Sequence, residues 1–336
     1  MTEKVDASVR PSELDQEVDS RGFFHRQKNH FTKPFSGTDS NPVEAGRYRL
    51  VWAKGCQWSN RSSIVIELLG LDKAISTTIA GRNKHEKDYG WEFVNGKNSI
   101  DEVFGVQFLS ELYANADPEY KGRPTVPALV DIKTKKVVNN DYHWLTNHFE
   151  KDFKELHAKN APDLYPEELQ TEIDEFNIWL FDHVNNAPYR AQFGQSIEAY
   201  NEAINTFYRS LDNLEERLEN QRFLFGDYVT DADVRFFVTL ARFDTRYYRN
   251  LGPLPKRIID YKNIWAYARD LYTIPAFKHN TYFHDIAKKE KVNDSNFQDF
   301  ATRFWQDFDY EGLWSEPQNR RALSKTPEQK FKLEKD

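Results

Sequence analysis

The chain of 336 residues contains a single cysteine, Cys56, and this residue is the first candidate for chemistry. It follows a short apolar run that begins at Tyr48, and it precedes apolar residues at helical spacing that end at Gly70. We therefore predict a strand, a turn and a helix, with Cys56 at the N-terminus of the helix. The unpaired N–H groups at a helix N-terminus favour thiolate over thiol, which would make this sulfur nucleophilic near neutral pH.

Two interpretations of Cys56 stay open on this evidence. A lone cysteine also packs as a small hydrophobic side chain that does no chemistry. If Cys56 is catalytic, an external thiol must complete its cycle, because the chain has no second cysteine with which to form an internal disulfide. A single thiol also favours a reducing compartment, so we expect the protein in the cytoplasm.

Composition argues against several classes of partner. The formal net charge is −7 at pH 7 and no stripe of Lys and Arg dominates any segment, so we expect no nucleic acid partner. No window approaches the roughly 18 uncharged apolar residues of a membrane span, and residues 1–20 lack the apolar core of a signal peptide. We expect no membrane partner and no metal site.

The elements that position Cys56 follow a βαβαββα order. After the first strand and helix, residues 74–80 have the Ile and Thr content of a strand, and residues 101–116 have apolar side chains at helical spacing. Two more strands lie on either side of a polar turn at residues 133–136, and Asp141 can cap the helix that follows them. This order predicts a thioredoxin-like domain.

Pro127 stands at the entrance of the third predicted strand, where a proline without an N–H group is tolerated. A cis peptide bond at this position would leave the backbone of the preceding residue, Val126, able to pair with an extended ligand. The residues alone do not decide between cis and trans.

The second half of the chain predicts an all-α domain. Apolar periodicity indicates four helices, at residues 167–184, 196–218, 231–243 and 264–272. Thr230 and Asp233 form a capping box before the third of these helices. The fold class is thus α/β plus all-α. Its predicted parts are an N-terminal extension at 1–45, a thiol-binding domain at 46–150, a helical domain at 165–320 and a charged tail at 321–336.

Both ends of the chain carry expectations of their own. The N-terminal extension lacks a sustained period, but its phenylalanines indicate that part of it packs, and we expect it to lie over the first domain. These are Phe23, Phe24, Phe31 and Phe35. From Glu316 onward the chain is charged and contains proline, which predicts a frayed tail.

Six motifs in consistent order are similar to those of one protein family. In the first domain they are Cys56-Gln57-Trp58-Ser59, Gly90-Trp91-Glu92-Phe93 and Gly122-Arg123-Pro124-Thr125-Val126-Pro127. In the second they are Asn185 to Tyr189, Thr230 to Arg235, and Arg242 to Tyr247. Over roughly residues 20–300 the chain resembles the xi class of glutathione transferases, the glutathionyl-hydroquinone reductases. The resemblance implies a helical glutathione-transferase C-terminal domain, glutathione as co-substrate and a homodimer.

The resemblance also implies a mechanism. Cys56 would attack the sulfur of a glutathionyl-hydroquinone and be left as a mixed disulfide that a second glutathione resolves. Trp91 and the backbone of Val126, beside a cis Pro127, would hold the tripeptide.

Two tyrosines complete the site that the resemblance implies. Tyr189 and Tyr247 would face the aromatic leaving group and donate to its oxygen as charge develops there. Without the resemblance we would assign both tyrosines, and Trp91, to packing.

Three departures from the family pattern concern the thiol site. Gln57 replaces the proline that follows the family cysteine, and this returns an N–H group next to the sulfur. Asn140 and Asp141 stand where the family has the Glu and Ser that bind the amine and the γ-glutamyl carboxylate of glutathione. At this position Asp141 would repel the carboxylate of glutathione. Either Asp141 takes over the contact with the amine instead, or the thiol is not glutathione. Ser110 stands where an Arg is expected.

The sequence therefore favours a cysteine-dependent thiol transferase that acts on a glutathionylated aromatic compound or another mixed disulfide. One alternative is a binding or structural protein of the same shape whose thiol cycle has been lost, and the altered Asn140-Asp141 pair supports it. Another is a conjugating transferase that activates glutathione with Tyr or Ser, which is weaker because Cys56 holds the family position.

Overall fold

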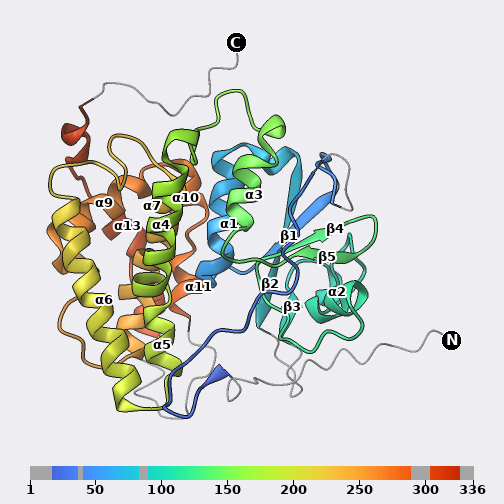
Figure 1. Cartoon of the computed structure of the whole chain (residues 1–336), viewed down its shortest axis with the longest axis horizontal. Coiled ribbons are helices and arrows are strands. Elements are labelled where there is room, and N and C mark those ends of the chain that lie inside the picture. Colours follow the sequence, from blue (N-terminus) through green and yellow to red (C-terminus); the bar gives the residue numbers. More distant parts are fainter. Residues whose placement is uncertain (1–16, 37–40, 83–89, 289–302, 326–336) are drawn as a thin grey trace. The chain divides into compact units, whose positions relative to one another are not determined.

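The computed structural model describes residues 17–36, 41–82, 90–288 and 303–325. These residues form two compact units, shown in Figure 1. The sheet unit contains Glu17 and residues 26–158, and the helical unit contains residues 18–25 and everything described from Lys159 onward. In the described residues, no helix is both long enough and apolar enough to cross a membrane.

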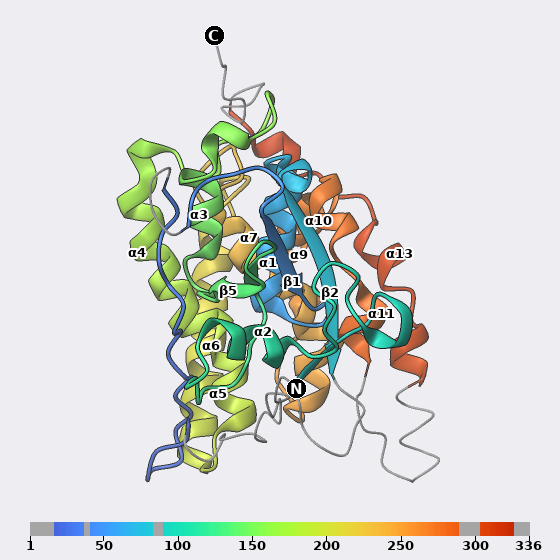
Figure 2. The ribbon, with the colours of Figure 1, turned by 90° about the vertical axis from the view of Figure 1, so that its right-hand side faces the viewer.

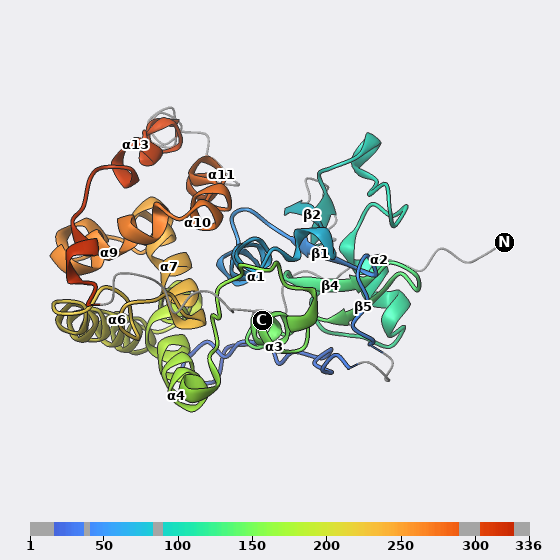
Figure 3. The same cartoon turned by 90° about the horizontal axis from the view of Figure 1, so that it is seen from above.

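The sheet unit has five strands in the order β3-β2-β1-β4-β5. Strand β1 is parallel to β2 and antiparallel to β4, while β3 and β5 run antiparallel to β2 and β4 at the two edges. Helices α1 and α3 lie on one side of the sheet and α2 on the other (Figure 3). The elements are β1 (Tyr48–Trp52), α1 (Gln57–Leu68), β2 (Ile75–Arg82), β3 (Trp91–Phe93), α2 (Leu109–Ala116), β4 (Ala128–Asp131), β5 (Lys136–Asn139) and α3 (Leu145–Lys151). The predicted thioredoxin-like fold is confirmed.

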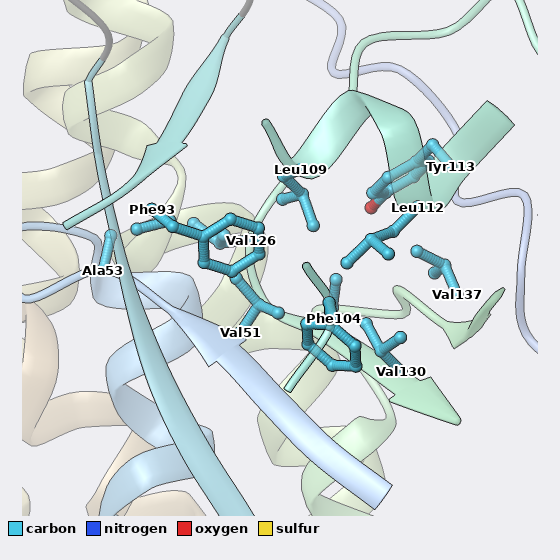
Figure 4. Close-up of a cluster of buried hydrophobic side chains, with 12 residues drawn as sticks. Val51, Ala53, Phe93, Phe104, Leu109, Leu112, Tyr113, Val126, Val130 and Val137 are labelled. Carbon is cyan, nitrogen blue, oxygen red and sulfur yellow. The ribbon is translucent and has the colours of Figure 1, made fainter. Parts of the chain in front are cut away.

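A cluster of buried apolar side chains joins the sheet to α2 (Figure 4). Its members include Val51, Ala53, Phe93, Phe104, Leu109, Leu112, Val126, Val130 and Val137. Burying such side chains stabilises the unit by about 1.5–3 kcal/mol for each large residue. Because Ala53 and Val126 belong to this cluster, the core fixes both the segment before Cys56 and the loop that enters β4.

Strand register places two loops at one end of the sheet. Val51 in β1 lies opposite Ala128 in antiparallel β4, so the chain leaves β1 where it enters β4. The turn that carries Cys56 and the loop that carries Val126 and Pro127 are therefore neighbours.

The helix predicted over residues 101–116 is wrong in its first half, because α2 begins only at Leu109. Asp101 is buried, and its Oδ1 accepts hydrogen bonds from the backbone N–H groups of Val103 and Phe104. The chain then turns at Gly105, whose φ of 72° lies in the left-handed region. A side chain that binds nearby backbone in this way competes with helix formation. Strand β3 was not predicted.

The helical unit contains all four predicted helices, with ends shifted by a few residues. Helix α7 packs against α4 and α9, and α10, α11 and α13 gather on one side of this unit (Figure 2). The helices are α4 (Gln170–Leu180), α5 (Ala187–Phe193), α6 (Ile197–Arg217), α7 (Asp231–Arg242), α8 (Tyr248–Asn250), α9 (Lys262–Tyr272), α10 (Pro275–His279), α11 (Phe283–Ala287) and α13 (Tyr310–Trp314). Two π-helical turns, η6 (Phe181–Asn185) and η7 (Phe243–Tyr247), extend α4 and α7.

The predicted capping box before α7 is confirmed. Asp233 Oδ2 accepts a hydrogen bond of 2.7 Å from the Thr230 N–H, and Asp233 Oδ1 accepts one of 2.7 Å from the hydroxyl of Tyr267. Burial raises the pKa of Asp233, which these hydrogen bonds oppose. The box therefore ties the start of α7 to α9.

The expectations for the two ends of the chain hold in part. Residues 1–16 of the N-terminal extension lie outside the described residues, and only part of the rest packs in the sheet unit. Phe31 and Phe35 pack in the sheet unit, whereas Phe24 packs on Phe193 in the helical unit, with ring centroids 5.3 Å apart. The expectation of a frayed tail is wrong for its described part. Arg320 is 3% exposed and donates to the carbonyl of Leu218. Residues 326–336 lie outside the described residues.

Candidate active site

Cys56 stands immediately before α1, as predicted, with extended backbone angles of φ −87° and ψ 117°. Its carbonyl accepts the first helical hydrogen bond, 3.0 Å long, from the N–H of Asn60. The thiol is half-buried and donates to the carbonyl oxygen of Val126, with Sγ and O 3.7 Å apart. The sulfur thus faces the loop that enters β4, at the positive end of a helix of 12 residues.

The turn around Cys56 is held by a buried serine. Ser59 Oγ accepts a hydrogen bond of 3.1 Å from the N–H of Ala53, and it lies 3.4 Å from the carbonyl oxygen of Cys56. The N–H of Cys56 itself donates to the Ala53 carbonyl at 2.9 Å. Ser59 is fully buried, so this small network fixes the backbone that carries the sulfur.

The Val126–Pro127 peptide bond is cis, as the family resemblance implied. The loop before it is fastened by Tyr113, whose hydroxyl donates to the Thr125 carbonyl at 2.8 Å and accepts from the Thr125 N–H at 3.2 Å. Burial raises the pKa of Tyr113, so its hydroxyl stays protonated. Among the described residues, the N–H of Val126 has no acceptor. It can therefore bind an extended ligand beside Cys56.

Trp91 begins β3 at the edge of the sheet, opposite Arg82 of β2. The ring is half-buried and packs against the apolar cluster of the sheet unit. Gly90, with φ of 77°, brings the chain into this strand. The backbone of Trp91 is thus held in the sheet, while part of its ring remains exposed.

Asn140 and Asp141 follow β5 and differ in exposure. Asn140 is fully buried, and its Oδ1 accepts a hydrogen bond of 2.9 Å from the N–H of Phe31. Asp141 is 7% exposed and caps the turn before α3, because its Oδ1 accepts from the N–H groups of His143 at 3.0 Å and Trp144 at 3.2 Å. Among the described residues, its second oxygen, Oδ2, accepts no hydrogen bond.

Tyr189 and Tyr247 meet within the helical unit. Tyr189 belongs to α5 and Tyr247 ends the π-helical turn η7, and their ring centroids are 5.8 Å apart in an edge-to-face arrangement. Burial raises the pKa of Tyr247 well above its usual value, and the neighbouring Tyr189 adds to the shift. Tyr247 therefore remains a protonated donor. Single π-helical turns of this kind are frequent at functional sites.

The structure thus brings together Cys56 with Val126, and Tyr189 with Tyr247. The sequence did not indicate Ser59 as the residue that fixes the cysteine turn. It also did not indicate two residues of the N-terminal extension that bind the loop before Val126 and the turn at Asp141. These are Gln27 and Asn29. Their partners lie about a hundred residues away in the chain, so no local pattern could have indicated them.

Comparison with known proteins agrees with this arrangement. The family model "Glutathione S-transferase, C-terminal domain" matches residues 197–270. The glutathionyl-hydroquinone reductase YqjG of Escherichia coli is 36% identical over 281 residues, which cover 82% of this chain and 84% of that protein. The glutathione-bound structure of YqjG has a TM-score of 0.74 at 33% identity and covers 87% of this chain and 96% of that one. The xi glutathione transferase of Phanerochaete chrysosporium has a TM-score of 0.73 at 35% identity, with 78% and 90% covered.

The chain has the glutathione-transferase fold, because a thioredoxin-like unit is followed by a helical unit that matches the family model of the transferase C-terminal domain. Within that class, the chain belongs to the xi family, that of the glutathionyl-hydroquinone reductases, and it is an enzyme of this type. The predicted family is confirmed.

Proposed function

We propose that this enzyme reduces glutathionyl-hydroquinones, or related mixed disulfides, through a mixed disulfide on Cys56. The observation that carries the proposal is the position of the sulfur. Cys56 Sγ lies at the N-terminus of α1 and 3.7 Å from the carbonyl oxygen of Val126, the residue before the cis proline. The E. coli relative is named a glutathionyl-hydroquinone reductase, and its structure has been solved with glutathione bound.

The reaction has two steps. In the first, the Cys56 thiolate attacks the sulfur of the glutathionyl-hydroquinone, the bond between that sulfur and the aromatic carbon breaks, and the carbon takes up a proton. The hydroquinone leaves, and Cys56 and glutathione share a disulfide. In the second step, the thiolate of another glutathione attacks the glutathione sulfur of that disulfide. Glutathione disulfide leaves and the Cys56 thiolate is restored.

The thiol co-substrate is assigned to the sheet unit. The N–H of Val126 binds the backbone of the tripeptide next to Cys56, and the partly exposed face of Trp91 packs along it. Asp141 Oδ2 accepts from the amine of glutathione, since Oδ1 is already bound by the protein. Asn140 has no exposed surface and supports the site through the segment it binds.

The aromatic leaving group is assigned to the tyrosine pair of the helical unit. Tyr247 is protonated because burial raises its pKa, so it can donate to the phenolic oxygen of the substrate. Tyr189, its ring neighbour, contributes a second hydroxyl and an aromatic edge.

The test compares the wild type with Cys56→Ser in the turnover of a glutathionyl-hydroquinone in the presence of glutathione. Chromatography measures the hydroquinone that is released. We expect Cys56→Ser to reduce turnover by about a thousandfold or more. A matched control moves the single thiol to an exposed position, as Glu219→Cys in the Cys56→Ser background. This variant should stay inactive. Equal turnover in the wild type and Cys56→Ser would refute the role of the sulfur.

A further inference from the structure

A short segment of the N-terminal extension, residues 26–33, lies against both thiol-binding loops of the sheet unit. We call this segment the arm. One end of it bonds to the loop that leads to Val126, and the other end bonds to the residues that follow β5. None of these contacts involves the sulfur of Cys56, and one of them reaches Asp141, the proposed partner of the glutathione amine.

The first contact is a reciprocal pair between Gln27 and the backbone of Arg123. Gln27 Nε2 donates to the Arg123 carbonyl, and Gln27 Oε1 accepts from the Arg123 N–H, both at 3.0 Å. The Arg123 side chain in turn pairs with Glu17 at 2.7 Å, and Glu17 is 7% exposed. Arg123 precedes Val126 by three residues. The arm therefore fastens the start of the loop that ends in the cis proline.

The second contact joins the arm to the end of β5. Thr32 forms an antiparallel bridge with Asn139, and Phe31 exchanges hydrogen bonds with Asn140 through both its N–H and its carbonyl, each 2.9 Å long. The Phe31 ring packs edge to face on Tyr113, with centroids 5.7 Å apart. These hydrogen bonds fix the backbone of Asn140 and therefore the position of the next residue, Asp141.

The third contact reaches Asp141 itself. Asn29 Nδ2 donates to Asp141 Oδ1 at 2.7 Å, on the same oxygen that caps the turn before α3. Three donors on one oxygen fix the rotation of the carboxylate. As a result, Oδ2 is the oxygen left for a ligand.

We propose that two residues of the arm are part of the thiol site, Asn29 as a positioning residue for Asp141 and Gln27 as a positioning residue for the Val126 loop. The proposal rests on the proposed function, in which Asp141 and Val126 bind the thiol. It assigns a role in co-substrate affinity to a segment outside the thioredoxin-like core. Without Asn29 the Asp141 carboxylate can rotate, which weakens its proposed charge-assisted hydrogen bond to the amine of glutathione, a bond worth about a tenfold change in affinity.

The experiment measures KM for glutathione and kcat with the full-length enzyme. The variants are Asn29→Ala and Gln27→Ala, and the matched control is Lys28→Ala. Lys28 lies between the two, is exposed, and forms no side-chain hydrogen bond or ion pair with the described residues. We expect Asn29→Ala to raise KM for glutathione about tenfold while kcat stays within about twofold. We expect Lys28→Ala to match the wild type.

A coupling measurement separates positioning from a general loss of stability. If Asn29 acts through Asp141, Asn29→Ala should raise KM no further in the Asp141→Asn background. An Asn29→Ala enzyme with the KM of Lys28→Ala, or an additive effect in the double variant, would overturn the proposal and leave the proposed function intact.

If the wild type does not turn over with glutathione, the proposed function fails first. Hydrogen exchange of the backbone amides of His143 and Trp144 then tests the arm. Faster exchange in Asn29→Ala than in Lys28→Ala supports the positioning of this loop, and equal exchange contradicts it.

Discussion

At the scale of single residues, one sulfur and one carboxylate oxygen bear most of the proposed chemistry. The Cys56 sulfur lies at the N-terminus of α1 and contacts the backbone carbonyl of Val126. Asp141 divides its two oxygens, one for the protein and one for a ligand. In the proposed site the second oxygen meets the amine of glutathione, so the aspartate would not face a ligand carboxylate.

The role of Asp141 can be tested with a modified co-substrate. Asparagine caps a helix about as well as aspartate, so Asp141→Asn should preserve the turn before α3. We expect it to raise KM for glutathione about tenfold, since a charge-assisted hydrogen bond is lost. With N-acetylglutathione, which has no free amine, the wild type and the variant should have similar KM values. A loss of equal size with both thiols would show that Asp141 does not bind the amine.

At the scale of elements, the site depends on turns that side chains fix from a distance. Ser59 holds the Cys56 turn and Tyr113 holds the Val126 loop. In the helical unit, Asp244 lies in the π-helical turn that ends at Tyr247. Its carboxylate accepts hydrogen bonds from the N–H groups of Ile258 at 2.7 Å and Ile259 at 3.2 Å.

Asp244 predicts a pH dependence of stability. Burial raises its pKa to about 6, although two backbone N–H groups lower it. Since an unfolded aspartate titrates near pH 3.9, roughly, the folded state binds the proton more tightly. The contribution to stability is fully present below about pH 4 and is lost as the pH rises through about 6. Relative to Asp244→Asn, the wild type should lose about 1 kcal/mol of unfolding free energy between pH 5 and pH 7.

Urea unfolding of both proteins at pH 5 and pH 7 checks this expectation. Groups other than Asp244 titrate equally in the two proteins, so the difference between them isolates this carboxylate. A difference that is constant with pH, or that favours the wild type more strongly at pH 7, would be inconsistent with a raised pKa.

Local patterns were sufficient to predict much of the fold. The strand and helix around Cys56 and the capping box of Thr230 and Asp233 depend on residues close in sequence, and the structure contains them. The helix predicted from residue 101 failed because Asp101 binds the backbone of the next residues, which apolar spacing cannot reveal. Strand β3 has three residues, too few to show an alternating apolar pattern, and it is defined by its pairing with β2.

The site was predicted less completely than the fold. The position of Cys56 before α1 was predicted from the sequence, and the family resemblance indicated the cis bond before Pro127. The chemistry assigned to Cys56 stays a prediction. The contact of Asn29 with Asp141 spans 112 residues of sequence, and neither residue marks the other. Contacts of this kind depend on tertiary structure, and only the folded chain shows them.

At the scale of the whole molecule, the chain pairs a sheet unit that carries the sulfur with a helical unit that carries the tyrosines. The family resemblance implies that the enzyme is a homodimer, and two-fold dimers are the commonest symmetric assemblies of soluble proteins. We expect light scattering in solution to give a mass about twice the chain mass of 39.7 kDa. A mass equal to that of one chain at micromolar concentration would contradict a stable dimer.

The proposed mixed disulfide on Cys56 is tested by the intact mass of the protein after incubation with a glutathionyl-hydroquinone, in the wild type and in Cys56→Ser. We expect that the wild type alone gains the mass of one glutathione and that the hydroquinone appears in solution. Adding glutathione should then remove the adduct and release glutathione disulfide. No adduct on the wild type, or the same adduct on Cys56→Ser, would contradict a mixed disulfide on this sulfur.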